Sequence, residues 1–261
     1  MKQTEALEVL KTGVNVFLTG EPGSGKTYTV NQYIDYLRVH NIEPAITAST
    51  GIAATHLNGL TIHSWSGIGI KEKLSQKDLD KIASASYIAK RVKQAKVLVI
   101  DEISMLEAKT FDMVNLVCCK IRQNKQPFGG LQIVVVGDFF QLPPIDRSGG
   151  GAQFAFKSEA WANANLTVCY LTEQYRQDDA DFLTMLSAIR INSFNDGHLL
   201  YLKSRMVALH ASPQNITRIF SHNFDVDRLN SQELAKLAGK PEFFYMFSRG
   251  QRNFVENLKR G

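Results

Sequence analysis

The segment 20–27, Gly-Glu-Pro-Gly-Ser-Gly-Lys-Thr, strongly constrains what this chain can fold into. It matches the pattern G-x-x-x-x-G-K-[ST], in which the backbone N–H groups of a glycine-rich loop surround phosphate groups. The pattern is meaningful where a strand precedes it and a helix follows it. Residues 14–19 are largely apolar and β-branched, as in a buried strand, and residues 26–39 show helical apolar spacing. The segment therefore predicts a phosphate-binding loop.

The chemistry of this loop points to a nucleoside triphosphate with its magnesium ion. The positive end of the helix dipole adds to the N–H groups that face the phosphates. We expect Lys26 to bridge the β- and γ-phosphates and Thr27 to offer its hydroxyl to Mg²⁺. The alternative, a glycine turn with a surface lysine, is disfavoured by the flanking strand and helix. We predict ATP and Mg²⁺ as cofactors, with the nucleotide bound by Gly20, Pro22, Gly23, Ser24, Gly25, Lys26, Thr27 and Tyr28.

Further apolar segments alternate with helical ones along the chain. Beyond residues 14–19, strands are expected over 44–48, 97–100, 131–136 and 166–171. Continuous apolar strands that alternate with helices indicate a parallel sheet covered on both faces. We therefore predict an α/β fold, a P-loop NTPase with a RecA-like parallel sheet and helices on both faces.

The pattern changes after residue 177. Helices are expected over about 179–191 and 195–204, followed by a strand over 216–220 and a helix over 226–238. One strand–helix unit is too little for a whole sheet. We therefore predict a first RecA-like ATP-binding domain over 1–177 and an incomplete second RecA-like domain over 178–261.

Two acidic residues follow the apolar strand 97–100. The carboxyl end of a central parallel strand faces the ligand crevice of such a fold. Asp101 is therefore expected to hold Mg²⁺, directly or through water, and Glu102 to polarise the attacking water. Asp–Glu pairs are common on surfaces, so this assignment depends on the strand before the pair and on the phosphate loop.

The strand 131–136 delivers another polar group to the same edge. Gln141 is a neutral donor and acceptor that is suited to contact a γ-phosphate and to respond to its loss. The alternative is that Gln141 is a turn residue and Asp138 a helix cap, and the residues alone leave the two open.

The net charge of +5 is concentrated in one window of the sequence. Residues 71–96 hold eight basic and three acidic residues, which by itself accounts for the whole positive excess. A local basic surface on a neutral body indicates a polyanionic partner, and a solvated helical face is the equal alternative.

Other features argue against several classes of protein. No apolar run approaches the ~20 residues that span a bilayer, and residues 1–5 carry acid and no apolar signal segment. Cys118, Cys119 and Cys169 lack the spacing of a disulfide framework or a zinc site. We expect an intracellular protein that is not secreted and has no membrane partner, in the cytoplasm or nucleoid if bacterial and in the nucleus if eukaryotic.

Several motifs together resemble the Pif-one (petite integration frequency) family, superfamily-one B DNA helicases that move 5′ to 3′ on single strands. The match runs from about residue 3 to residue 230 and is specific because the motifs occur in the family order. RecD-type helicases are the nearest alternative. The motifs are Thr-Ala-Ser-Thr-Gly-Ile-Ala-Ala at 47–54, Thr-Ile-His-Ser at 61–64, Asp-Glu-Ile-Ser-Met at 101–105, Gly-Asp-Phe-Phe-Gln-Leu-Pro-Pro at 137–144 and Tyr-Arg-Gln at 175–177.

The resemblance implies roles for further residues. Gln3 matches an adenine-recognising glutamine, and Arg176 matches an arginine that reaches the γ-phosphate and stabilises transition-state charge. The alternatives are an exposed helix-start residue for Gln3 and a surface salt bridge for Arg176. The basic window matches a small insertion over about 62–96 near the strand-separation point. The residues that the resemblance assigns to single-stranded DNA are Thr50, Gly51, His63, Ser64 and Trp65, with core packing as the alternative for Trp65.

The resemblance implies an ATP-dependent 5′-to-3′ helicase motor core. Its expected partners are single-stranded DNA and duplex or quadruplex junctions, in repair, recombination or telomere maintenance, with the chain acting as a monomer. The family's later motifs are absent after residue 230, so nucleotide binding is expected to survive while processive unwinding is impaired. The alternatives are a nucleotide- and DNA-binding module without unwinding, an ATPase that remodels protein, and a RecD-like helicase.

Overall fold

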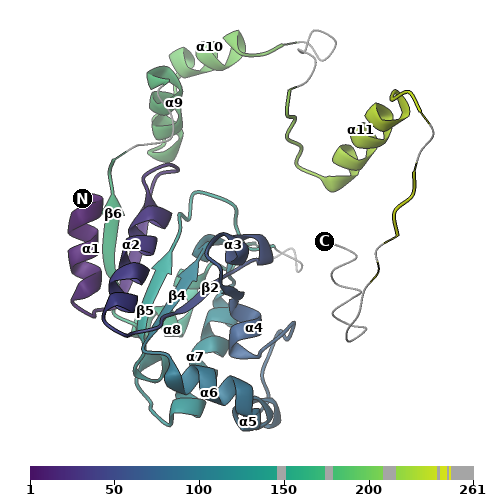
Figure 1. The fold of residues 1–261 in the computed structure, drawn as a ribbon. Coiled ribbons are helices and arrows are strands. Elements are labelled where there is room, and N and C mark those ends of the chain that lie inside the picture. The colour runs from purple at the N-terminus through teal and green to yellow at the C-terminus, as the bar shows by residue number, and fades with distance from the viewer. Residues whose placement is uncertain (146–150, 174–178, 208–215, 240–241, 246, 248–261) are drawn as a thin grey trace. The chain divides into compact units, whose positions relative to one another are not determined.

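The computed structural model describes residues 1–145, 151–173, 179–207, 216–239, 242–245 and 247 (Figure 1). The chain divides into two compact units, Met1–Tyr201 and Leu202–Gly261. Its strands are β1 (Val16–Gly20), β2 (Ala45–Ala48), β3 (Leu60–Thr61), β4 (Val97–Asp101), β5 (Gln132–Val136) and β6 (Thr167–Leu171). Its helices include α1 (Gln3–Lys11), α2 (Lys26–Val39), α3 (Gly51–His56), α4 (Ile62–Ser66), α5 (Gln76–Ser84), α6 (Ser86–Gln94), α7 (Ala108–Arg122), α8 (Glu159–Asn163), α9 (Ala180–Arg190), α10 (Asp196–Ser204) and α11 (Asn223–Ala235). Short 3₁₀ segments are η1 (Ile103–Met105), η2 (Pro127–Gly130) and η3 (Ala155–Lys157).

The six strands of the first unit form one parallel sheet in the order β3-β2-β4-β5-β1-β6. β5 lies between β1 and β4, with Val134 in register with both Val16 and Val99. The carboxyl ends of these three strands therefore meet at one edge of the sheet. The predicted parallel sheet is confirmed, and β3 is a short strand that the sequence did not reveal.

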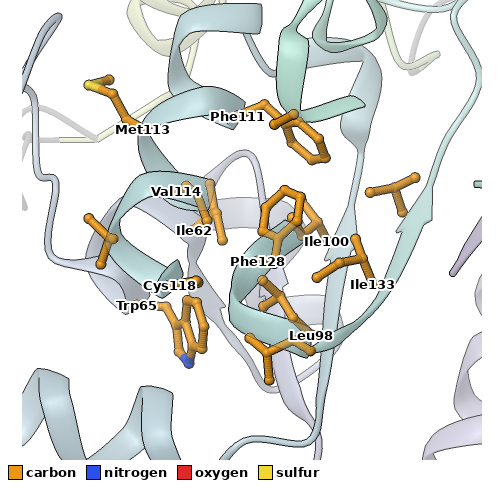
Figure 2. Packing of buried hydrophobic residues seen from close by; sticks show 14 of the residues in the cluster. Ile62, Trp65, Leu98, Ile100, Phe111, Met113, Val114, Cys118, Phe128 and Ile133 are labelled. Carbon is orange, nitrogen blue, oxygen red and sulfur yellow. The ribbon is translucent and has the colours of Figure 1, made fainter. Parts of the chain in front are cut away.

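Both faces of the sheet are covered, because alternate side chains of each central strand enter different cores. In β4, Val97 and Val99 pack with α1 and α2, whereas Leu98 and Ile100 pack on the opposite face. The second core is built mainly from α4 to α8 and contains Phe111 of α7 (Figure 2). This packing explains why the central strands are apolar over most of their length, and it fixes their register.

The basic window 71–96 folds as the pair of helices α5 and α6, which pack against each other and against α7. Ser75 caps α5 in a capping box with Asp78. The inner faces are apolar, with Ile82 and Ile88 buried. Lys77, Lys81, Lys90 and Lys93 therefore lie on the exposed outer faces of two short amphipathic helices.

The expected strand over 216–220 is wrong. These residues have no regular secondary structure, and Ile219 is 94% exposed. A strand needs a neighbour to satisfy its backbone groups, and the described residues of the second unit contain no other strand. The helix expected after it is present as α11, and the expected helices near 179–191 and 195–204 are present as α9 and α10. No helix among the described residues is both long enough and apolar enough to cross a membrane.

Candidate nucleotide and nucleic-acid sites

The phosphate-binding loop connects β1 to α2 at the carboxyl edge of the sheet. Gly25 caps α2 with a φ of +84°, in the left-handed region that favours glycine. Gly20 has a φ of +151°, and a Cβ atom there would lie 2.7 Å from the carbonyl oxygen of Leu171. Side chains are therefore excluded where the loop turns, and the first N–H groups of α2 stay open to an anion.

Lys26 lies inside this loop. Its Nζ atom donates to the carbonyl oxygens of Gly20 at 2.9 Å and of Glu21 at 3.0 Å. Burial lowers the pKa of Lys26, while the charges of Asp138, Glu102 and, more weakly, Asp101 oppose that shift. The ammonium group is thus half-buried among acidic groups that come from β4 and β5.

A buried hydroxyl in the loop is consistent with a phosphate ligand. The Oγ atom of Ser24 is buried and has no hydrogen-bond partner among the residues that the structure describes. Buried polar atoms are nearly always paired, so an unpaired one calls for an explanation. A phosphate oxygen in the loop would accept a hydrogen bond from this hydroxyl. The residues present therefore fit a nucleotide phosphate.

The acidic pair stands at the end of β4, as predicted. The Glu102 N–H donates to Oδ1 of Asp101 at 2.8 Å. Burial raises the pKa of Asp101 to about 6, against the effect of that hydrogen bond. Glu102 has φ +52° and ψ +46°, a left-handed conformation that is unusual for a residue other than glycine. Such conformations are concentrated at functional sites, where the surroundings hold them in place.

A magnesium ion is compatible with these groups. The described residues contain no cluster of three or more His, Cys, Asp or Glu side chains that would form a metal site by themselves. Mg²⁺ is usually bound by one or two protein ligands together with substrate phosphates and water. The Asp101 carboxylate and the exposed Thr27 suit that mode, with the phosphates supplying the remaining charge.

The loop that follows β5 brings Gln141 to the same edge of the sheet, where its side chain forms a hydrogen bond with Asp138. Oδ2 of Asp138 accepts from Nε2 of Gln141 at 3.3 Å and from Nη1 of Arg190 at 2.8 Å. Burial alone would raise the pKa of Asp138, but bonds from Arg190, the Phe140 N–H and Gln141 hold it below its usual range. Asp138 is therefore a buried ionised acceptor. The sequence did not reveal this role, although an acid after a strand and an arginine in the expected helix 179–191 are both visible in it.

Gln3 lies against the phosphate-binding loop. Its Nε2 atom donates to the carbonyl oxygen of Ser24 at 3.1 Å, and a Cβ atom on Gly25 would collide with it. Tyr28 is 58% exposed in the first turn of α2, and its hydroxyl accepts a hydrogen bond from Gln32. The structure thus brings Gln3 and the loop together, and recognition of adenine by Gln3 stays a prediction. Arg176 lies outside the described residues.

The residues assigned to DNA follow β2 and β3 at the same edge. Thr50 caps α3 by accepting from the N–H of Ala53 at 3.3 Å, and Gly51 is exposed. Ser64 is also exposed. Burial lowers the pKa of the half-buried His63, against the charge of Glu107.

Trp65 does not belong to this surface. Its side chain is 4% exposed and packs in the core of α4 to α8 (Figure 2). The predicted stacking of this ring on a base is therefore wrong, because a base cannot reach it. The sequence could not separate the two roles, since both use an aromatic residue on a short helix.

The basic helices, α5 and α6 with the residues that flank them in the window 71–96, carry lysines that form no ion pair with the described residues. Each acidic residue of the window pairs with a lysine: Asp78 with Lys71, Asp80 with Lys120 and Glu72 with Lys109. Arg91 turns inward, where it donates to the Ser64 carbonyl and stacks on Tyr87. Among the described residues, the lysines of the window without an ion pair are Lys73, Lys77, Lys81, Lys90, Lys93 and Lys96.

Comparisons with known proteins show the family and the fold of this chain. The family model described as PIF1-like helicase matches residues 2–202. The ATP-dependent DNA helicase Pif1 of Psychrobacter sp. (strain PRwf-1) is 47% identical over 270 residues, covering 100% of this chain and 41% of that protein. The chain therefore spans less than half the length of this relative.

Solved structures show the same fold. The crystal structure of Pif1 helicase from Candida albicans superposes with a TM-score of 0.84 at 30% identity, covering 99% of this chain and 60% of that one. The crystal structure of a Bacteroides Pif1 helicase in complex with ADP-AlF3 and ssDNA gives a TM-score of 0.73 at 26% identity. The match covers 92% of this chain and 58% of that one.

Proposed function

Because the chain belongs to the PIF1-like helicase family, we propose that it is the ATP-binding motor portion of a DNA helicase. In this proposal, Mg²⁺–ATP hydrolysis drives 5′-to-3′ movement along single-stranded DNA. The motor opens duplexes or G-quadruplexes during repair, recombination or telomere maintenance inside the cell. The observation that carries the proposal is the convergence of Lys26, Asp101, Glu102 and the Asp138–Gln141 pair at one edge of the sheet.

Each group has a chemical task in the proposed reaction. Lys26 leaves the loop carbonyls for the β- and γ-phosphates, and the phosphate-loop amides surround the phosphate oxygens. Thr27 and Asp101 would hold a magnesium ion, which when bound would supply charge neutralisation at the transferred phosphoryl group. Glu102 orients and polarises the attacking water. Gln141 contacts the γ-phosphate, Gln3 recognises adenine and Arg176 stabilises the transition state.

Single-stranded DNA is the proposed partner at the ends of β2 and β3. The exposed Gly51 is the first residue of α3, and the exposed Ser64 lies in α4. These two helices follow β2 and β3 at the carboxyl edge of the sheet, where the nucleotide is proposed to bind. The Bacteroides relative, in complex with ADP-AlF3 and ssDNA, supports this pairing of ligands. Differential affinity of the ATP and ADP states for the strand is what would move the motor.

ATP turnover with and without single-stranded DNA tests the proposed function. We expect slow hydrolysis by the chain alone and a higher rate when single-stranded DNA is added. A rate that single-stranded DNA leaves unchanged would favour an ATPase that remodels protein. No turnover in either condition, with nucleotide still bound, would favour a binding module.

The binding module is the second candidate function. It is favoured by one observation: the described residues of the second unit contain no strand, whereas a two-domain motor closes a second sheet over the nucleotide. In that case the chain binds nucleotide and DNA without unwinding. A strand-displacement assay separates the two candidates.

The unpaired lysines of the basic helices are expected to set the salt dependence of DNA binding. Replacing Lys77 and Lys81 of α5 with alanine removes two positive charges from this surface. The slope of log K against log salt should then fall in magnitude by ~0.7 for each DNA phosphate that is no longer neutralised. The measurement is fluorescence anisotropy with a labelled single strand over a salt series.

A matched control removes lysines that are already engaged elsewhere. Lys11 pairs with Glu8 and Lys236 with Glu233, and neither lies in the basic window. Their double alanine variant should keep the parent slope. If the Lys77 and Lys81 variant keeps it too, the basic helices are a solvated face and do not bind DNA.

A further inference from the structure

The helix α9 contacts two different loops of the nucleotide site. Ser187 and Arg190 lie three residues apart, on one face of the helix. The Ser187 hydroxyl is 3.4 Å from both carboxylate oxygens of Glu21, a residue of the phosphate-binding loop. The Arg190 guanidinium donates to Asp138, which follows β5. One helix face thus joins the loop after β1 to the loop after β5.

The Arg190 side chain is held firmly in this position. It is 12% exposed, and the Asp138 side chain with which it pairs is 1% exposed. The guanidinium carbon lies 4.3 Å from the ring centroid of Phe140 and 5.8 Å from that of Tyr170. Two aromatic rings and one buried carboxylate therefore fix the arginine, as planar guanidinium groups allow.

Arg190 and Gln141 share one acceptor. Both donate to Oδ2 of Asp138, at 2.8 Å and 3.3 Å, while Oδ1 accepts from the Phe140 N–H at 3.2 Å. Both oxygens of the carboxylate accept hydrogen bonds in this arrangement, and the position of Oδ2 determines where the Gln141 amide lies. Without Arg190, the buried charge of Asp138 would lack its cation and would attract the Lys26 ammonium group. The charge of Asp138 already acts on that group, because it opposes the lowering of the Lys26 pKa by burial.

We propose that Arg190 is a positioning residue of the ATPase site: by holding Asp138 it sets the Gln141 amide, and so determines whether the site distinguishes a γ-phosphate. This inference rests on the proposed function, because it assigns Gln141 to the γ-phosphate. It adds a residue on α9, outside the phosphate-binding loop and the acidic pair, that acts only through Asp138.

A double-mutant cycle tests this link. The variants are Arg190→Met, Gln141→Ala and the two combined, with Asp138→Asn as a second way to break the same link. Arg38→Met is the matched control, since Arg38 forms an exposed ion pair with Glu43 on the surface. Two quantities are measured with Mg²⁺: the ratio of affinities for a non-hydrolysable ATP analogue and for ADP, and kcat with KM for ATP.

We expect Arg190→Met to abolish the preference for the ATP analogue as fully as Gln141→Ala does. The kcat should fall by about 10- to 100-fold, the cost of a misplaced group, while ADP affinity stays within about twofold of the parent. The combined variant should be no worse than Gln141→Ala alone, because the two residues act in series. Asp138→Asn should behave like Gln141→Ala, and Arg38→Met like the parent.

Three results would overturn the inference. The first is a parent that binds the ATP analogue and ADP equally. The second is an affinity ratio that survives in Arg190→Met and in Asp138→Asn. The third is a combined variant whose loss is the product of the single losses. The affinity ratio needs no turnover, so a parent that does not hydrolyse ATP contradicts the proposed function and still leaves this link open to its test.

Discussion

Replacement of Lys26 by alanine is expected to lower kcat/KM for ATP by about 10²- to 10³-fold, the usual loss when one charge-stabilising donor is removed from a transition state. Lys26 is the cation of the phosphate-binding loop, and its Nζ atom donates to the carbonyl oxygens of Gly20 and Glu21. Those bonds are readily exchanged for phosphate oxygens. In the alanine variant this cation is missing, and the triphosphate would face only the acidic groups around it, which are Glu102, Asp138 and Asp101.

The measurement is steady-state ATP hydrolysis in the presence of single-stranded DNA. Lys236→Ala is the matched control, because Lys236 is exposed and pairs with Glu233 in the second unit. Folding of both variants is compared by thermal unfolding. A Lys26→Ala protein that hydrolyses ATP at the parent rate would show that the loop does not serve catalysis.

Substitution of Glu102 by glutamine is expected to separate binding from chemistry. The side chain keeps its size but loses the carboxylate that polarises water, so kcat should fall by about 10²- to 10⁴-fold. Nucleotide affinity should stay near that of the parent, because Lys26 and the loop amides still hold the phosphates. The left-handed backbone conformation of Glu102, with φ +52°, sets the direction of the side chain and does not depend on its charge. The glutamine side chain should therefore occupy the same place.

Single-turnover hydrolysis and equilibrium binding of an ATP analogue give the two quantities separately. Glu43→Gln is the matched control, since Glu43 lies on the surface and pairs with Arg38. If Glu102→Gln loses nucleotide affinity and keeps its turnover rate per bound ATP, then Glu102 belongs to the binding of the nucleotide or its metal, and another group positions the water.

Much of this arrangement follows from local sequence rules. The phosphate-binding loop, the acidic pair and Gln141 each follow an apolar strand, and parallel strands bring their carboxyl ends to one edge. The apolar strands and their parallel direction are therefore sufficient to predict that Lys26, Asp101 and Gln141 lie at the same edge of the sheet. The covering of both sheet faces followed from the same uninterrupted apolar runs.

Other features depend on contacts between distant segments, which no local pattern contains. The ion pair of Asp138 and Arg190 joins residues 52 apart in the chain, so their shared burial was invisible in the sequence. Trp65 points inward because α4 packs on α7, and a five-residue helix is too short to show an apolar face. The segment 216–220 has strand-like residues, yet a strand also requires a partner.

A crystal structure of this chain with Mg²⁺ and ADP–aluminium fluoride tests the central claim most directly. The account predicts the nucleotide phosphates inside the loop 20–27, with the Lys26 ammonium moved from the Gly20 and Glu21 carbonyl oxygens to the phosphoryl mimic. It also predicts Mg²⁺ between the Thr27 hydroxyl and the Asp101 carboxylate. A nucleotide bound elsewhere, or a loop occupied with Lys26 still on the two carbonyl oxygens and no metal near Asp101, would contradict the account.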